Sequence, residues 1–259
     1  MAMRSTWKGT LSFGMVVIPV KLYGATEEHK ISLNQLHTAC KSRIKMPKYC
    51  PTCEKFLEPG EISKGYPLDK EHFVELAEAD MATLPLASIK SIAVKLFAKG
   101  ELDPRMVTDH YYLSPDEAGA KAFVLFMKAM EASGVYAVAR ITMREREHLC
   151  ALRPFGGVLL MQTLHWADEV RDYGELIATA TVSDKEMQMA QAFIAAMTGE
   201  ARLDEEKDLF TDAMKELIAA KLAGKVIEAP AAPAKQETDL VDALMASLKA
   251  TGAEVPVPA

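Results

Sequence analysis

One histidine and three cysteines lie between positions 37 and 53 with the spacing of metal ligands. Two residues separate His37 from Cys40, and two residues separate Cys50 from Cys53. Such pairs let two side chains reach the same tetrahedral ion. The loop between the pairs has little apolar surface with which to order itself, and zinc binding can supply folding free energy of about 10 kcal/mol. We therefore predict one structural zinc ion per chain, held by all four side chains, with free or redox-active thiols as the alternative.

A zinc ion with four protein ligands has no open position at which a water molecule could be activated. The sequence also lacks the phosphate-binding Gly-rich loop with Lys and Ser or Thr, the Rossmann glycine fingerprint, the nucleophile elbow and the helical His pair of zinc proteases. These observations predict a protein that is not an enzyme. A metal-dependent hydrolase is the alternative, and it would need an open coordination position.

Basic side chains are concentrated in the first fifth of a chain whose net charge is −6. Residues 1–50 contain eight Lys and Arg residues against two Glu residues, whereas residues 174–259 carry a net charge of −7. This separation of charge permits a local phosphate-binding surface in an acidic protein. For any single cation, a solvated side chain or a salt bridge is a better interpretation than a phosphate contact. Only the clusters of cations therefore support phosphate binding. The candidate phosphate-binding residues are Arg4, Lys8, Lys41, Arg43, Lys45, Lys48, Arg140, Arg144, Arg146 and Arg153.

Short segments rich in Val, Ile, Leu and Tyr dominate the first 175 residues and predict strands. They cover residues 16–23, 88–97, 135–143 and 157–164, and residues 148–153 are expected to pair with the last of these as a hairpin. Many strands with few helices between them favour an antiparallel barrel or sandwich over a parallel sheet. We expect a mainly β fold with added helices, built on an antiparallel β-barrel core.

One helix is expected to interrupt the strands. Ser114 is a candidate N-cap with Pro115 at the first helical position, and the helix can run to residue 133 before Gly134 stops it. Its expected packing stripe on the barrel is Ala122, Leu125, Phe126 and Met130.

Two further helices are expected after residue 173. A capping box of Ser183 and Glu186 opens the first, and Gly199 is placed to end it. The second ends near Gly224. Their apolar stripes are Met187, Ala190, Ile194 and Met197 in the first helix, and Phe210, Ala213, Met214, Leu217, Ile218 and Leu222 in the second.

A Pro- and Ala-rich linker precedes a short amphipathic segment at the C-terminal end of the chain. The segment begins at a candidate N-cap, Thr238, and its apolar face holds Leu240, Val241, Leu244 and Leu248. Proline-rich sequence on both sides leaves it without an obvious core to join. We expect a partner-docking helix, with a helix folded back on the domain as the alternative.

The expected location is the cytoplasm. No run approaches the length of a membrane-spanning helix, and residues 1–10 lack the apolar stretch of a secretory signal. Three of the four cysteines are crowded into fourteen residues, which is unlike the disulfide framework of a secreted domain. No membrane partner is expected.

The sequence from Arg4 to Tyr23 resembles the opening of bacterial Ku proteins. Residues 64–66 (Lys-Gly-Tyr), 111–113 (Tyr-Tyr-Leu) and 152–154 (Leu-Arg-Pro) recur in similar order in that family. The segment from Leu240 to Leu248 looks like the family's C-terminal motif that engages the end-joining ligase. The resemblance covers nearly the whole chain.

The resemblance implies a homodimer whose two barrels and bridging arms form a ring. The ring threads onto double-stranded DNA ends in non-homologous end joining, at the nucleoid, and recruits an ATP-dependent end-joining DNA ligase. A ring recognises an end topologically, so its contacts need address only phosphate and groove shape. Many relatives carry a long Lys-rich tail after this motif, whereas the present sequence ends in Thr-Gly-Ala-Glu-Val-Pro-Val-Pro-Ala, so the resemblance does not extend to tail-mediated bridging of DNA ends.

The resemblance divides the chain into four parts. Residues 1–175 form a barrel and bridge core with a zinc-knuckle-like loop at 37–53. Residues 176–227 form a helical arm or dimerisation region, residues 228–237 a linker, and residues 238–259 the ligase-docking tail. The alternative function is a zinc-stabilised barrel that binds single-stranded nucleic acid or acts as a transcriptional adaptor. The aromatic content of 7% weighs against that reading.

Overall fold

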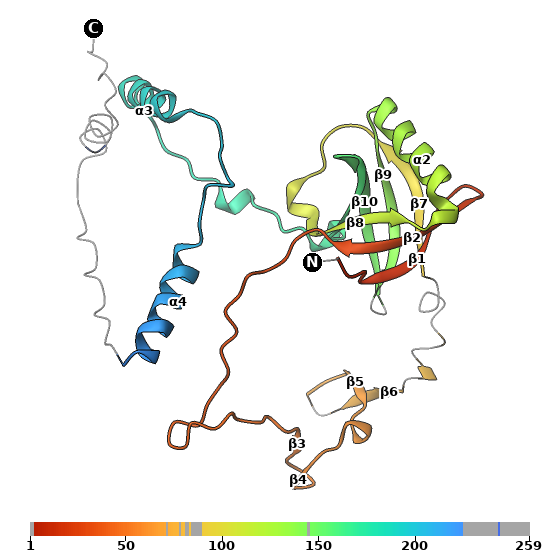
Figure 1. Cartoon of the computed structure of the whole chain (residues 1–259), viewed down its shortest axis with the longest axis vertical. Helices are drawn as coiled ribbons and strands as arrows, with labels where there is room; N and C mark the ends of the chain where they lie inside the picture. Colours follow the sequence, from red (N-terminus) through yellow and green to blue (C-terminus); the bar gives the residue numbers. More distant parts are fainter. Residues whose placement is uncertain are drawn as a thin grey trace. The chain divides into compact units, whose positions relative to one another are not determined.

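The computed structural model describes residues 3–70, 72–77, 79–80, 83, 90–143, 146–224 and 243. It divides the chain into two units, Met1–Asp172 and Tyr173–Ala259 (Figure 1). Among the helices in these ranges, none is both long and apolar enough to cross a bilayer. Several predicted features lie outside the described residues: Arg144, the start of the 88–97 strand, the linker, and the docking residues Leu240, Val241, Leu244 and Leu248.

Seven strands of the first unit form a closed barrel, which confirms the predicted barrel core. In barrel order they are β1 (Trp7–Phe13), β2 (Val16–Gly24), β8 (Val107–Pro115), β11 (Val158–Leu164), β10 (Arg146–Phe155), β9 (Tyr136–Met143) and β7 (Ser91–Ala98). Six neighbouring pairs are antiparallel. The seventh pair, β1 with β7, is parallel, so the barrel is mixed rather than fully antiparallel as expected.

Alternate residues of each strand point into the barrel and form its core. Leu11, Ile18, Ile92, Ile141 and Leu152 have no solvent exposure. Most of their neighbours in sequence are more exposed, as the two-residue period of a strand requires, whereas Ala151 beside Leu152 is also buried. Strand β7 departs from this period. Its register shifts between Val94 and Leu96, and Leu96 is 53% exposed. The bulge therefore leaves Leu96 exposed, although it lies an even number of residues from the buried Ile92.

The β10–β11 hairpin is confirmed, with β10 beginning two residues before the predicted start. Its turn is Gly156-Gly157, and both residues have positive φ, 55° and 84°. Two-residue turns of this kind match the twist of the flanking strands. The hairpin therefore fixes the register in which Phe155 lies opposite Val158.

Helix α2 (Ala120–Ser133) begins later than predicted. Ser114 is not its N-cap, because β8 continues through Pro115 and Ser114 lies opposite Lys21 of β2. The backbone N–H of Asp116 then donates to the Pro19 carbonyl, and a 3-10 turn, η3 (Glu117–Gly119), leads into the helix. Residues with a local helix-start signal are thus part of a strand, because strand pairing overrides the local helix preference.

Helix α2 packs on the barrel through a stripe one position away from the predicted one. Its buried residues are Phe123, Phe126, Met127 and Met130, whereas Leu125 is 69% exposed. The Phe126 ring stacks on Phe13 of β1 with ring centroids 4.5 Å apart. The predicted contact of the helix with the barrel is confirmed, and the predicted role of Leu125 in it is wrong.

Between β2 and β7 the chain forms two small two-stranded sheets. The first pairs β3 (Tyr49–Cys50) with β4 (Lys55–Phe56), and the second pairs β5 (Lys64–Pro67) with β6 (Phe73–Leu76). The 3-10 turn η1 (Pro59–Glu61) separates them. Nearly all of their side chains are exposed. These strands were not predicted, because they lack the alternating apolar pattern of a strand with one buried face.

The second unit contains the two predicted helices, α3 (Asp184–Met197) and α4 (Leu209–Leu222). The Ser183–Glu186 capping box is present, and Gly224 follows α4 with φ 69°. The predicted stripes, however, are largely exposed. In α3 the buried residue is Met189, whereas Ile194 and Met197 are each 63% exposed. Helix α4 has no fully buried residue, and Phe210 and Leu222 of its apolar face are 74% and 84% exposed.

Candidate functional site

His37 and Cys40 lie in one tight turn at the start of the predicted zinc loop. The His37 Nδ1 atom is 3.0 Å from the Cys40 Sγ atom. The backbone N–H of Lys41 donates to the His37 carbonyl at 2.8 Å, and Lys41 has a φ of 57°. Hydrogen bonds from Ser42, and then from His37, lower the pKa of the Cys40 thiol to about 7. The turn therefore presents the two side chains as an adjacent pair that favours thiolate.

Cys50 and Cys53 form a second pair on the β3–β4 hairpin. Cys50 lies opposite Lys55, and Cys53 lies in the turn between the strands. The backbone N–H and the thiol of Cys53 hydrogen-bond the Cys50 sulfur and lower the pKa of Cys50. The same contact raises the pKa of Cys53, whose thiol proton it engages. Cys50 is thus the more readily deprotonated thiol of this pair.

The four side chains match zinc in donor type, but they lie as two separate pairs. No group of three or more His, Cys, Asp or Glu side chains arranged to hold a metal occurs among the described residues. Each pair by itself offers two of the four ligands that a tetrahedral site needs. The structure therefore brings together His37 with Cys40 and Cys50 with Cys53, without joining the two pairs.

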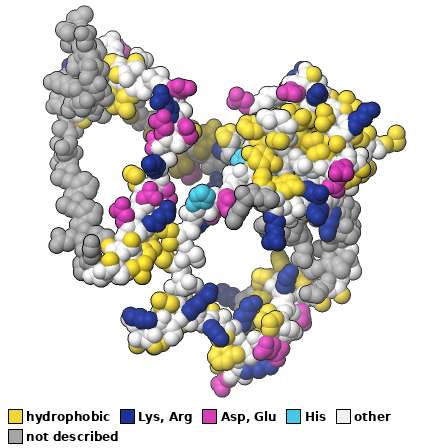
Figure 2. Space-filling model, in the orientation of Figure 1, with side chains coloured by type: hydrophobic (Ala, Val, Ile, Leu, Met, Phe, Trp, Pro, Cys, Tyr) yellow, Lys and Arg dark blue, Asp and Glu magenta, His cyan; other side chains and the backbone are white. Residues whose placement is uncertain are grey.

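The segment between the two pairs, which we call the basic loop (residues 41–48), is exposed throughout. Its cations are Lys41, Arg43, Lys45 and Lys48. None of them forms an ion pair with a described residue, whereas nearby Lys55 pairs with Glu61 at 2.6 Å. Figure 2 shows Lys and Arg side chains at the surface of the barrel as well as of the segment that carries β3 to β6. The basic loop is therefore charged without local compensation.

The predicted phosphate-binding cations on the barrel differ in whether a carboxylate neutralises them. Arg140 pairs with Glu147 at 3.2 Å and lies over the Trp166 ring at 5.6 Å. Arg153 lies over the Tyr136 ring at 5.6 Å, and its Nε atom is buried without an acceptor. Arg4, Lys8 and Arg146 are exposed and form no ion pair in the described ranges. Charge is thus neutralised at Arg140 and left uncompensated at the other four positions.

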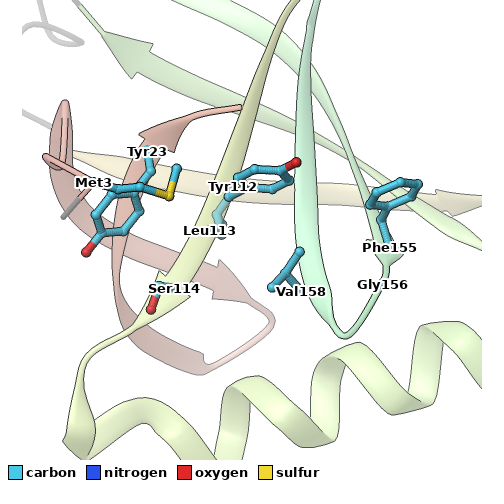
Figure 3. A pocket seen from close by; sticks show the side chains of 8 residues that line it. All are labelled: Met3, Tyr23, Tyr112, Leu113, Ser114, Phe155, Gly156 and Val158. Atoms are coloured by element: carbon cyan, nitrogen blue, oxygen red, sulfur yellow. The ribbon is translucent and has the colours of Figure 1, made fainter. Parts of the chain in front are cut away.

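Sequence reasoning missed a hollow on the outer wall of the barrel. Its volume is about 470 Å³, and its lining combines Met3 with aromatic side chains of three strands and part of the β10–β11 turn (Figure 3). The lining residues are Met3, Tyr23, Tyr112, Leu113, Ser114, Phe155, Gly156 and Val158. The only signal in the sequence is that Tyr23 and Tyr112 occupy alternate strand positions next to buried leucines. This signal can be used only once the strand register is known.

Comparison with known proteins places the chain in a family. The family model described as the Ku70/Ku80 beta-barrel domain matches residues 12–189.

Three relatives are each named Non-homologous end joining protein Ku. The one from Symbiobacterium thermophilum is 42% identical over 98% of this chain, which spans 64% of that relative's length. The one from Archaeoglobus fulgidus is 41% identical over 96% of this chain and 99% of its own. The one from Bacillus subtilis is 34% identical, with coverage of 96% and 83%. The chain therefore belongs to the Ku family.

Proposed function

We propose that this chain binds the ends of double-stranded DNA without sequence specificity, in non-homologous end joining. The name shared by the relatives supports the pathway. The observation on the chain itself that carries the proposal is the basic loop, where four exposed cations have no ion-pair partner in the described part of the chain. Uncompensated cations bind phosphate because they release condensed counterions from the duplex.

The charge on the barrel supports the same ligand. Arg4, Lys8, Arg146 and Arg153 add uncompensated charge to that of the basic loop. Arginine and lysine contacts to phosphate fix the position of a protein on a duplex but carry no sequence information. Binding of ends irrespective of their sequence needs only such contacts.

A ring-shaped homodimer is the assembly that fits selectivity for ends. The chain's barrel is closed, so β-strand pairing at its edges cannot join two barrels. Helices α3 and α4 instead expose apolar side chains, such as Ile194, Met197 and Phe210, that need a partner surface. We propose that they contribute to a two-fold interface or to an arm beside it.

Two further parts of the proposal rest on the sequence. The segment with Leu240, Val241, Leu244 and Leu248 docks an ATP-dependent DNA ligase through its apolar face. One structural zinc ion per chain, held by His37, Cys40, Cys50 and Cys53, rigidifies the basic loop between them. The donor chemistry of the two pairs and the lowered pKa of Cys40 support the zinc ion.

The experiment that tests end binding compares three forms of one duplex across a range of salt concentrations: linear, linear with both ends blocked, and closed circular. We expect binding to the free linear form only, with affinity that falls steeply as salt rises. Equal affinity for the circular form would refute selectivity for ends. Sedimentation of the free protein and of the complex measures the subunit number, and a monomer on DNA would refute the ring.

A further inference from the structure

One row of side chains crosses the outer wall of the barrel from β2 to β9. Tyr23 lies opposite Tyr112, Tyr112 opposite Leu160, and Leu160 opposite Arg153. Arg153 in turn contacts the Tyr136 ring. We call these five residues the aromatic row. Since neighbouring strands are about 4.8 Å apart, the row extends over about 19 Å.

The row faces outward and is only partly covered. The residues that flank its members along the strands, Leu22, Leu113, Leu152 and Leu159, are buried in the core. Each row member is half-buried. The hollow of about 470 Å³ lies at the β2 and β8 end of the row, where Phe155 and Val158 add to its apolar lining (Figure 3). A volume of this size is in the range of small-molecule sites, so the hollow can accept a planar ring.

The cation of the row lacks an anionic partner. Within the described ranges, Arg153 has no carboxylate partner, and its buried Nε atom has no acceptor. Lys21, by contrast, lies beside the row and pairs with Asp116. A half-buried, unneutralised guanidinium two residues before Phe155 favours an anionic ligand, since burial of an unpaired charge is costly.

Aromatic side chains beside an uncompensated cation are features with which proteins hold single-stranded nucleic acid. Bases stack on the rings, and the cations follow the phosphates. A peptide strand cannot be added here, because the closed barrel offers no free edge. Arg4 follows directly on Met3 of the hollow and adds a second exposed cation.

From these contacts we infer that the aromatic row binds the unpaired nucleotides of a DNA end that carries a single-stranded overhang. The inference rests on the proposed function and deepens it, because the duplex is held by the basic loop and the overhang by the barrel wall. One base occupies the hollow against Tyr23, Tyr112 and Phe155. The phosphate beside it lies near Arg153.

The test uses the full chain and one duplex, made blunt or with a short oligothymidine overhang that contains one 2-aminopurine. We expect the overhang to raise affinity about tenfold over the blunt duplex, with quenching of the 2-aminopurine as it stacks. Tyr112→Leu and Phe155→Ser should bring the affinity for the overhang to within about twofold of that for the blunt duplex. Tyr112→Phe, which keeps the ring, should retain the preference.

Tyr66→Leu is the matched control, because Tyr66 is 62% exposed on β5 and lies outside the row. Phe155 is 58% exposed at a hairpin turn, so its replacement reports on binding without loss of the core. Equal affinity of the unaltered chain for blunt and overhang duplexes would overturn the inference and leave the proposed function standing. Failure to bind either duplex would overturn both. Displacement of the overhang by a peptide of residues 238–248 would assign the hollow to a peptide and also overturn the inference.

Discussion

The Trp7 indole N–H donates a hydrogen bond to the Thr142 carbonyl at 3.2 Å, across 135 positions of the chain. This bond joins β1 to β9 over the intervening strand β7. The Trp7 ring reaches this position by lying over Gly9, where a Cβ atom would collide with the ring and with the Lys90 carbonyl. Glycine at position 9 therefore leaves the room that the Trp7 ring and the Lys90 carbonyl occupy where β1 meets β7.

Gly9→Ala should lower the free energy of unfolding by about 1–3 kcal/mol, because the added methyl group displaces the Trp7 ring. Urea unfolding followed by tryptophan fluorescence measures the change. Gly60→Ala is the matched control, since no atom lies within 4 Å of a Cβ at that position. Equal stability of Gly9→Ala and the unaltered chain would show that the close approach of the Trp7 ring and the Lys90 carbonyl to position 9 does not contribute to stability.

Cys150 should resist alkylation in the native protein, unlike the three other cysteines in their metal-free state. Its side chain is fully buried, and burial raises its pKa to about 12. The ordinary thiol pKa is 9.0. Above that pH the unfolded state releases the proton while the native state keeps it, so stability should fall as pH rises toward 12. Mass spectrometry after iodoacetamide treatment checks the reactivity, and rapid labelling of Cys150 without denaturant would contradict it.

Protein purified without chelator should contain about one zinc ion per chain. Cys53→Ser should lower the zinc content, whereas Cys150→Ala should leave it unchanged because Cys150 lies in the barrel core. Elemental analysis measures both. If the unaltered chain returns no zinc, the four-ligand site is wrong, and the two side-chain pairs act separately.

Lys45→Gln should reduce by about 1 the slope of the logarithm of DNA affinity against the logarithm of salt concentration. Lys55→Gln changes the net charge equally but removes a cation that already pairs with Glu61. It should therefore leave the slope unchanged. Binding measured across a salt series decides the matter, and equal slopes for both variants would mean that overall charge, not the basic loop, sets the affinity.

Truncation after Gln236 should leave DNA-end binding intact and abolish stimulation of the end-joining ligase. The deletion removes the apolar face of Leu240, Val241, Leu244 and Leu248 but no candidate phosphate-binding residue. A ligation assay with and without the truncated chain measures stimulation. Undiminished stimulation would exclude the docking role, and a Leu244→Asp substitution in the full chain should reproduce the truncation.

The fold was predictable where local patterns and tertiary packing agree. The β10–β11 hairpin and helices α3 and α4 follow from turn residues, capping boxes and apolar periodicity. The start of α2 did not follow, because Ser114 carries a capping signal but pairs with β2 instead. Small sheets such as β3–β4 lack a buried face, so periodicity cannot reveal them.

The candidate site was predictable only as sets of residue types. Sequence spacing identified the two side-chain pairs and the basic loop, which are local features. It could not distinguish Arg140, neutralised by Glu147 seven residues later, from Arg153, which is not neutralised. The aromatic row depends on register across five strands, so no linear pattern could show it.

The parallel pairing of β1 with β7 lets the chain leave the barrel after β2 and rejoin it beside β1. The residues between β2 and β7 are a long connection whose two ends are fixed by the barrel. Each doubling of the length of such a connection costs only about 0.6 kcal/mol in loop-closure entropy. The connection that carries the basic loop can therefore change in length or sequence during evolution while the barrel keeps its architecture.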